Sequence, residues 1–284
     1  MSEALLSLNG VSVRRGSSLV LNDLSLDVTG GQLVLLKDKN GAGKSTIIEA
    51  SAGLLPLEKG EVLHNGNVLI DASGRSKRPK SAFGLTLQSD GCVGSLRVEE
   101  HLLNALDLAG GRIDVGPWLE RYNLAHRKHD LIAHLSGGQR RKVAMLAGML
   151  SGFVGQAPRI LLLDEPAAGL DAASRSLLVE DLHELRHRGN AILLASHHTD
   201  FTACATHLLT GNTMETNEAF EESKEGTDDM KSSSHKNNPA FRTGLLLNQR
   251  TLSTVASNGI AGFLTLGILL ALVDASAVDS SLMQ

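Results

Sequence analysis

Short apolar runs alternate with turn residues along the first part of the chain. The stretch LLSLNGVSVRRGSSLVLNDLSLDVTGGQLVLLK within residues 4–37 predicts antiparallel strands joined by tight Asn-Gly and Gly-Gly turns. From Gly43 the pattern becomes that of a helix, KSTIIEASAGLL, and a hairpin over EVLHNGNVLI follows, with its turn at Asn65 and Gly66. The chain therefore begins with a β-rich region that one helix interrupts.

The middle of the chain has the apolar spacing of amphipathic helices. Between Ser95 and Leu150 apolar residues recur every three and four positions, in LRVEEHLLNALDLAG and in SGGQRRKVAMLAGML. The runs ILLL at 160–163 and AILLAS at 191–196 flank a predicted helix near 173–188. Apolar runs without alternation are typical of strands buried on both faces of a parallel sheet. The pattern predicts an α/β domain with an inserted helical block.

The composition changes near Gly211. Residues 213–240 hold seven acidic residues, three lysines and a serine-rich stretch, which predicts a disordered linker. Residues 252–273 are 22 positions without a charge, long enough to cross a bilayer, although a buried core helix or a tail packed on the domain would show the same run. We therefore expect a folded domain at 1–212, the linker, and a membrane segment at 241–284. Basic residues before the span and acidic ones after it predict that its front faces the cytosol.

Net charge and cysteine usage exclude several other classes. The net charge of -4 and the isoelectric point near 6.3 disfavour a nucleic-acid partner. Cys92 and Cys204 have no metal-ligand spacing, so neither a disulfide framework nor a zinc site is expected. The start of the chain lacks the basic region and long apolar run of a secretory signal, which predicts an N-terminus that stays in the cytosol.

The stretch LKDKNGAGKST, residues 36–46, has the features of a phosphate-binding loop. Gly41 and Gly43 let backbone N–H groups approach an anion at the start of a helix, Lys44 can bridge β- and γ-phosphates, and Ser45 can hold a magnesium ion. By itself this short motif is only suggestive, because it arises by chance fairly often. The nucleotide-binding residues that it predicts are Asp38, Lys39, Asn40, Gly41, Ala42, Gly43, Lys44, Ser45 and Thr46.

A second and much rarer motif, LSGGQ at 135–139, also opens a predicted helix. Its hydroxyl and amide groups form a second candidate anion site, although a plain glycine-rich loop before a helix is the alternative. Two phosphate sites on one chain favour pairing between copies. The residues of this signature turn are Ser136, Gly137, Gly138 and Gln139.

Two carboxylates end the buried strand in ILLLDEP. Asp164 can reach a magnesium ion, while Glu165 projects to the other side and can act as a general base for an attacking water. His197 follows the strand in AILLAS, and ligands bind beyond the carboxyl ends of parallel strands. By spacing alone, His198 could equally be the functional histidine.

These motifs, together with LTLQSDG and AGLDAAS, occur in an order that resembles the nucleotide-binding domain of ATP-binding cassette (ABC) transporters over residues 4–211. The resemblance implies a P-loop NTPase fold of the ABC ATPase type: a parallel core sheet, an antiparallel β subdomain and an inserted helical subdomain. The uncharged run at 252–273 adds one expected C-terminal transmembrane helix.

The resemblance also implies the roles of individual residues, with ATP and Mg²⁺ as cofactors. Gln88 would touch the magnesium ion and the attacking water, so that Ser45, Gln88 and Asp164 form the metal set and Glu165, His197 and Gln88 the catalytic set. Ser136 and Gly138 would contact the γ-phosphate held by the opposite subunit. Asp171 would cross the dimer interface, and His197 would steady the γ-phosphate.

The sequence departs from the family pattern at two positions. Asp38 replaces the first glycine of the phosphate loop, and a carboxylate some 8 Å from phosphate would cost roughly 2 kcal/mol at an effective dielectric near 20, or about thirty-fold in affinity. Because the other motif residues are present, we expect the loop to work. Arg15 stands where the family has an aromatic residue, so it either stacks on adenine or is an exposed loop arginine, the better-supported alternative.

The short cassette, the missing aromatic residue and the tail together resemble the haem exporter ATPase of cytochrome c maturation, with the tail similar to the start of that system's permease. We therefore expect an ATPase that powers haem export as a homodimer with permease subunits, on the cytoplasmic face of the cell membrane. The alternatives are the ATPase of a short multidrug or lipid exporter, a non-pumping dimerisation switch, and a soluble cassette protein of translation or DNA repair.

Overall fold

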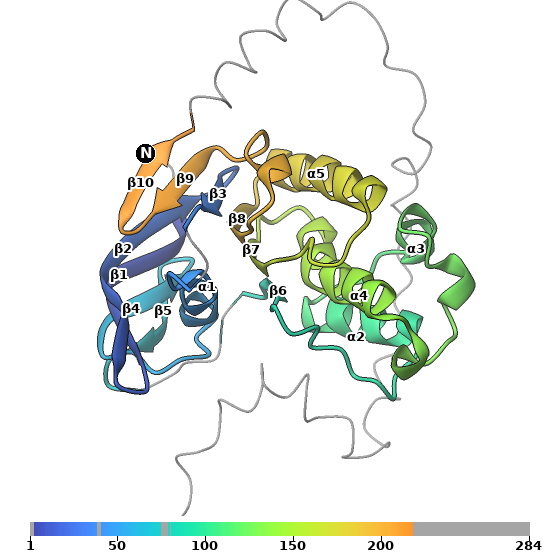
Figure 1. Cartoon of the computed structure of the whole chain (residues 1–284), viewed down its shortest axis with the longest axis horizontal. Helices are drawn as coiled ribbons and strands as arrows, with labels where there is room; N and C mark the ends of the chain where they lie inside the picture. The colour runs from blue at the N-terminus through green and yellow to red at the C-terminus, as the bar shows by residue number, and fades with distance from the viewer. Residues whose placement is uncertain (1–2, 39–40, 75–78, 80, 218–284) are drawn as a thin grey trace, which may run out of the picture.

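The computed structural model describes residues 3–38, 41–74, 79 and 81–217, and its strands form two sheets (Figure 1). The smaller sheet is antiparallel, in the order β2-β1-β4-β5. Asn65 and Gly66 both have positive φ in the turn between β4 and β5, as a tight hairpin requires, which confirms the predicted hairpin. The strands of this sheet are β1 (Ala4–Arg15), β2 (Ser18–Thr29), β4 (Lys59–His64) and β5 (Asn67–Asp71).

The larger sheet has six strands in the order β10-β9-β3-β8-β7-β6, all parallel except β10. Leu and Ile side chains fill its central strands, as the unalternated apolar runs predicted. Parallel pairing brings the carboxyl ends of β3, β7 and β8 to one edge. The strands are β3 (Leu33–Leu36), β6 (Gly84–Thr86), β7 (Ile160–Asp164), β8 (Ala191–Ala195), β9 (His207–Thr210) and β10 (Thr213–Thr216).

Helices cover both faces of the larger sheet. Ile160 and Leu162 of β7 belong to the apolar cluster that also holds residues of α1, whereas Leu161 and Leu163 belong to the cluster with α2, α4 and α5. In Figure 1, α1 and α4 accordingly lie on opposite sides of β6 and β7. The helices are α1 (Lys44–Ser51), α2 (Val98–Leu108), α3 (Gly116–Arg121), α4 (Gly137–Met149) and α5 (Ala172–His187), with 3-10 turns at Ala125–Arg127, Ile132–His134, Leu150–Phe153 and Thr199–Phe201.

The α4 helix approaches β6 unusually closely. A Cβ atom on Gly148 would lie 2.1 Å from Thr86 Oγ1, and one on Gly84 would lie 2.0 Å from Gly148 O. Only glycine allows the two backbones to pass at this distance. The contact fixes the C-terminal part of α4 on the strand that leads to Gln88.

Three sequence-based predictions were wrong in detail. Leu33–Leu36 is a parallel strand of the larger sheet rather than a member of the antiparallel one. Asn9 and Gly10 form an irregularity within the long strand β1, not a turn, because the pairing with β2 shifts register there. Strand β10 and the buried Asn217 extend the domain past the expected boundary at residue 212 into the segment predicted as linker.

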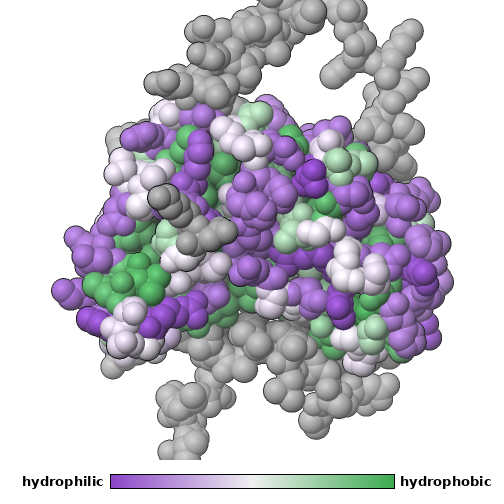
Figure 2. All heavy atoms as spheres, in the orientation of Figure 1, coloured by the Kyte–Doolittle hydropathy of each residue, from purple (hydrophilic) through white to green (hydrophobic). Residues whose placement is uncertain are grey.

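The face seen in Figure 2 is largely hydrophilic, and its most evident apolar patch lies over the antiparallel sheet. Within the described residues no helix is long and apolar enough to cross a bilayer. The predicted span at 252–273 and most of the predicted linker lie outside the described residues.

Candidate nucleotide site

The phosphate loop follows β3 and leads into α1. Gly43 caps α1 with φ +96°, and a Cβ atom there would lie 3.0 Å from Val20 Cγ1, so both conformation and space require glycine. Lys44 is only 8% exposed, and its Nζ donates a hydrogen bond to the Asp38 carbonyl. Lys39 and Asn40 lie outside the described residues. In the described part of the loop, glycine therefore occupies the N-cap of α1, and the Lys44 side chain turns back to the start of the loop at Asp38.

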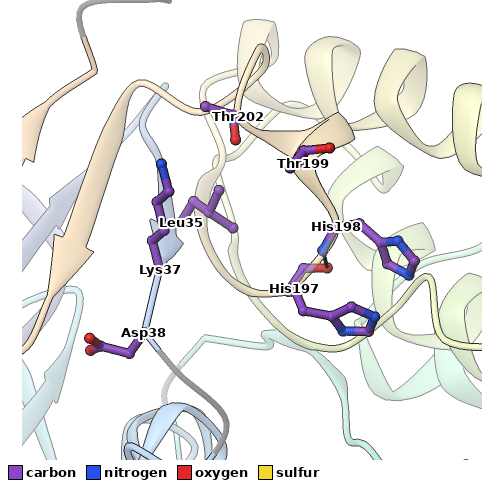
Figure 3. A pocket seen from close by; sticks show the side chains of 8 residues that line it. Leu35, Lys37, Asp38, His197, His198, Thr199 and Thr202 are labelled. Atoms are coloured by element: carbon purple, nitrogen blue, oxygen red, sulfur yellow. Dashed lines mark hydrogen bonds between the residues drawn. The ribbon is translucent and has the colours of Figure 1, made fainter.

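Asp38 directs its carboxylate away from this loop. Asp38 Oδ2 accepts a hydrogen bond of 2.8 Å from the Gly211 N–H, in the turn between β9 and β10. Figure 3 shows the carboxylate pointing away from Lys37 and His197. Asp38 is not among the non-glycine residues with positive φ, so its backbone does not need the freedom of glycine. The thirty-fold loss of ATP affinity expected from the sequence assumed that the Asp38 carboxylate faces the phosphates. Because the carboxylate instead accepts a hydrogen bond from Gly211, we expect a smaller loss of affinity.

Asp164, the last residue of β7, has the properties of a magnesium ligand. It is 1% exposed, and burial raises the pKa of its carboxyl group, while a hydrogen bond with the Ser45 side chain opposes that shift. Its Oδ1 is buried without a hydrogen-bond partner among the described residues. Mg²⁺ commonly binds through one or two carboxylates together with nucleotide phosphates. Ser45 and Asp164 therefore fit a magnesium ion shared with ATP.

Glu165 meets His197 at the adjoining strand ends. Glu165 Oε2 lies 2.9 Å from His197 Nδ1 and 3.4 Å from Ser196 Oγ, and the residue is 9% exposed. The ring of His198 stacks on that of His197, with centroids 4.2 Å apart. The structure therefore distinguishes the two histidines that spacing left open, because His197 is the one that contacts the carboxylate.

A hollow of about 340 Å³ adjoins these residues on the same edge of the sheet. In Figure 3 the two histidine rings lie beside each other, and the ammonium of Lys37 points away from both of them. The hollow is therefore an open border of the site. Its lining residues are Leu35, Lys37, Asp38, Ser196, His197, His198, Thr199 and Thr202.

The signature turn lies at the exposed start of α4. Ser136 caps the helix by accepting a hydrogen bond of 3.3 Å from the Gln139 N–H, and the Gln139 side chain accepts one of 3.0 Å from the Ser136 N–H. Ser136 and Gly137 are both exposed, and a Cβ atom on Gly138 would lie 3.2 Å from Gly169 O. The turn is thus preformed and presented outward.

Asp171 caps α5 in a similar way. Its carboxylate accepts a hydrogen bond of 2.7 Å from the Ser174 N–H and lies 3.1 Å from Lys142 Nζ of α4. The Ser174 amide and the Lys142 ammonium lower its pKa to about 2. The side chain remains 59% exposed, so its outer side is open to a partner.

Arg15, at the end of β1, forms an ion pair with Glu49 of α1. The pair places a planar guanidinium beside the helix that follows the phosphate loop. This neither requires nor prevents stacking on adenine, and that role stays a prediction.

Sequence reasoning missed Arg141. This buried arginine of α4 donates hydrogen bonds to the backbone carbonyls of four residues, Leu87, Gln88, Asp164 and Glu165. It ties the backbone at Gln88 to the backbone of the two acidic residues. The only sequence signal was a second basic residue after LSGGQ, which by itself indicates a solvated helix face.

Comparison with known proteins identifies the class. The sequence profile described as ABC transporter matches residues 21–168, and the chain belongs to this family. A solved structure titled "Structure of ATP binding subunit of ABC transporter" is similar with a TM-score of 0.61 and 26% identity, over 81% of this chain and 95% of that one. The P-loop ABC ATPase fold with one antiparallel and one mainly parallel sheet is thereby confirmed.

Similar curated proteins have different cargoes in their names. The Nod factor export ATP-binding protein I of Rhizobium leguminosarum is 31% identical over 69% of this chain and 62% of its own length. The zinc import ATP-binding protein ZnuC of Yersinia pestis is 30% identical over 69% of this chain and 71% of its own. The Fe(3+) ions import ATP-binding protein FbpC of Streptomyces coelicolor is 34% identical over 69% and 56%. The matched region thus spans less than two thirds of the Nod factor protein.

Proposed function

We propose that this chain binds and hydrolyses ATP as the nucleotide-binding subunit of an ABC transporter, and that it acts as a dimer of two such domains. The observation that carries the proposal is the pairing at the strand ends: Asp164 with Ser45, and Glu165 with His197. We assign one carboxylate to cation binding and the other to proton transfer. An acidic turn with a purely structural role would not require a separate partner for each carboxylate.

The residues perform different parts of the reaction. Lys44 binds the terminal phosphates, and the amides at the start of α1 support them. Ser45 and Asp164, with Gln88, would hold a magnesium ion that neutralises phosphate charge. Glu165 accepts the proton of the attacking water, and His197 holds that carboxylate in place until the γ-phosphate arrives.

The signature turn requires a second copy. Ser136 and Gly137 are exposed on α4, and α4 lies across the sheet from α1. We propose that the turn of one protomer closes on the nucleotide held by the loop of its partner. Permease subunits would complete the transporter, with this domain at the cytoplasmic face of the membrane.

The cargo is the finer part of the proposal. Haem export follows only from the brevity of the cassette, the missing aromatic residue and the resemblance of the tail, which lies outside the described residues. The named relatives act on Nod factor, zinc and Fe(3+), so they do not favour haem. The test is ATP hydrolysis in vesicles that contain the permease partner. Stimulation by haem and not by zinc or Fe(3+) would support haem as the cargo. Stimulation by zinc or Fe(3+) and not by haem would replace haem with that metal ion.

Steady-state hydrolysis of Mg-ATP by the full-length chain tests the function itself. Glu165→Gln should lower kcat on the order of a thousand-fold, with ATP binding retained, because removal of a general base commonly costs a hundred- to ten-thousand-fold. Glu120→Gln, on the exposed surface of α3, is the matched control and should leave kcat unchanged. Equal rates for the two variants would refute the role of Glu165.

A further inference from the structure

One guanidinium joins two turns of the site. Arg141 is 6% exposed in α4. Its Nη1 donates hydrogen bonds to Leu87 O at 2.6 Å and to Gln88 O at 3.2 Å, just beyond β6. Its Nη2 donates to Asp164 O at 2.7 Å and to Glu165 O, at the end of β7. All four acceptors are backbone carbonyls, so the side chain holds the course of the chain rather than a carboxylate.

The chemistry of the site requires arginine. A guanidinium is planar and presents several N–H donors in a fixed fork, whereas an ammonium is a compact charge that cannot serve two separated pairs of carbonyls. Hydrogen bonds from a charged donor are also stronger than neutral ones. Burial lowers the pKa of Arg141, and the nearby carboxylate of Asp164 opposes that shift. A buried cation is thus used to hold two turns together.

One of those turns is strained. Glu165 has φ +47°, in the left-handed region that disfavours side chains, and such a conformation persists only when its surroundings hold it. The Glu165 N–H donates to Ala195 O at 2.8 Å. Its carbonyl accepts from Ala168 N at 3.1 Å and from Arg141. Arg141 therefore supplies one of the three hydrogen bonds that hold the Glu165 backbone in this conformation.

We propose that Arg141 is a positioning residue for ATP hydrolysis, which sets the Gln88 and Glu165 backbones relative to each other and ties both to α4. The proposal rests on the proposed function. Because α4 begins with the signature turn, arrival of the partner's nucleotide at Ser136 would be transmitted through one side chain to the water-activating carboxylate. Arg141 would thereby connect the signature turn, which meets the partner's nucleotide, with Glu165, which meets the nucleotide of its own chain.

Three full-length variants test the proposal. Arg141→Gln removes the charge and most of the donors, and Arg141→Lys keeps only the charge. Arg140→Gln is the matched control, because Arg140 is the preceding residue of the same helix but pairs with Asp90, and its side chain is 39% exposed. We expect Arg141→Gln to lower kcat roughly a hundred-fold with KM changed less than three-fold, and Arg141→Lys to fall between it and the parent. Arg140→Gln should stay within two-fold of the parent.

Two further measurements separate positioning from folding. Hydrogen exchange of peptides over 85–90 and 163–168 should quicken in Arg141→Gln, whereas peptides from β3 and β8 should keep the parental rate. In the Glu165→Gln background, adding Arg141→Gln should lower the residual rate no further, because both changes act through one group.

The outcomes of these experiments are distinct. A parental chain without hydrolysis would overturn the proposed function and, with it, the role of Arg141 in a reaction. A folded Arg141→Gln variant with parental kcat and parental exchange would overturn the Arg141 proposal alone. Should Arg141→Gln fail to fold, the same criteria apply to Arg141→Lys.

Discussion

The edge of the sheet at β7 and β8 and the start of α4 differ in how far a single chain completes them. At the sheet edge Asp164 and Glu165 are buried, and each has a side-chain partner from another element of the same chain. At α4 the signature turn is held by its own capping box, and Ser136 faces solvent. The groups at the sheet edge thus have partners within the same chain, whereas the signature turn is ordered but exposed to solvent.

This difference indicates where the energy for closure would come from. Groups already buried and paired at the sheet edge gain little from a second protein copy. The ordered turn costs little entropy when a ligand meets it, because its backbone is fixed beforehand. ATP held by a partner can therefore bring two chains together without refolding either one.

The largest expected effect isolates the sheet edge. His197→Ala removes the group 2.9 Å from Glu165 Oε2 and should lower kcat between a hundred- and a thousand-fold. His198→Ala removes only a stacked ring and should lower it less than five-fold. Steady-state rates at saturating ATP measure both. An equal loss of activity in the two variants would show that hydrolysis does not depend on the contact between His197 and Glu165.

The next prediction isolates the signature turn. Ser136→Asp keeps a good helix cap but places a negative charge where the partner's γ-phosphate is expected. At about 6 Å and an effective dielectric near 20 that repulsion is about 3 kcal/mol, so hydrolysis should fall on the order of a hundred-fold. Ser136→Thr keeps cap and hydroxyl and should stay close to the parent. Binding of one ATP per chain, measured by calorimetry, should survive in both variants.

The sequence predicted most of the sheet edge because buried strands and the groups at their ends lie next to one another in the chain. Asp164, Glu165 and His197 could be found in this way. The sequence did not show which sheet Leu33–Leu36 joins, because an apolar run does not identify the strand that it pairs with. Arg141 could not be found either, because carbonyl acceptors leave no trace in side-chain patterns. The Gly84–Gly148 approach is likewise visible only once two distant glycines are seen to face each other.

A third prediction concerns the contact between strand β4 of the antiparallel sheet and the end of α1. His64 Nε2 lies 2.8 Å from Ser51 O at the end of α1, and burial lowers the pKa of His64 to about 4. The unfolded chain therefore binds more protons between about pH 6.5 and pH 4, so stability should fall as the pH drops through that window. The His64 share should be about 2 kcal/mol between pH 7.5 and pH 5.

Urea unfolding of the parent and of His64→Gln at both pH values measures that share. Because glutamine cannot titrate, the difference in pH dependence between the two chains isolates His64. Parallel curves for the two proteins would show that His64 is not held neutral in the fold.

The smallest expected effect concerns Asp38, at the border of the sheet edge. Asp38→Gly loses the hydrogen bond from the Gly211 N–H and should lower the free energy of unfolding by about 1 kcal/mol. Affinity for Mg-ATP should change less than three-fold, because the carboxylate points to the β9–β10 turn. Asp38→Asn keeps an acceptor without the charge. A rise in affinity of about thirty-fold in that variant would restore the repulsion expected from the sequence.

The mass of the particle formed by Glu165→Gln with saturating Mg-ATP tests most directly whether two chains complete each other's site. Light scattering of the full-length protein in detergent should give a dimer with ATP and a monomer without it. Adding Ser136→Asp to the same chain should restore the monomer even though ATP remains bound. A Glu165→Gln chain that binds ATP and stays monomeric, with and without the permease partner, would contradict the account.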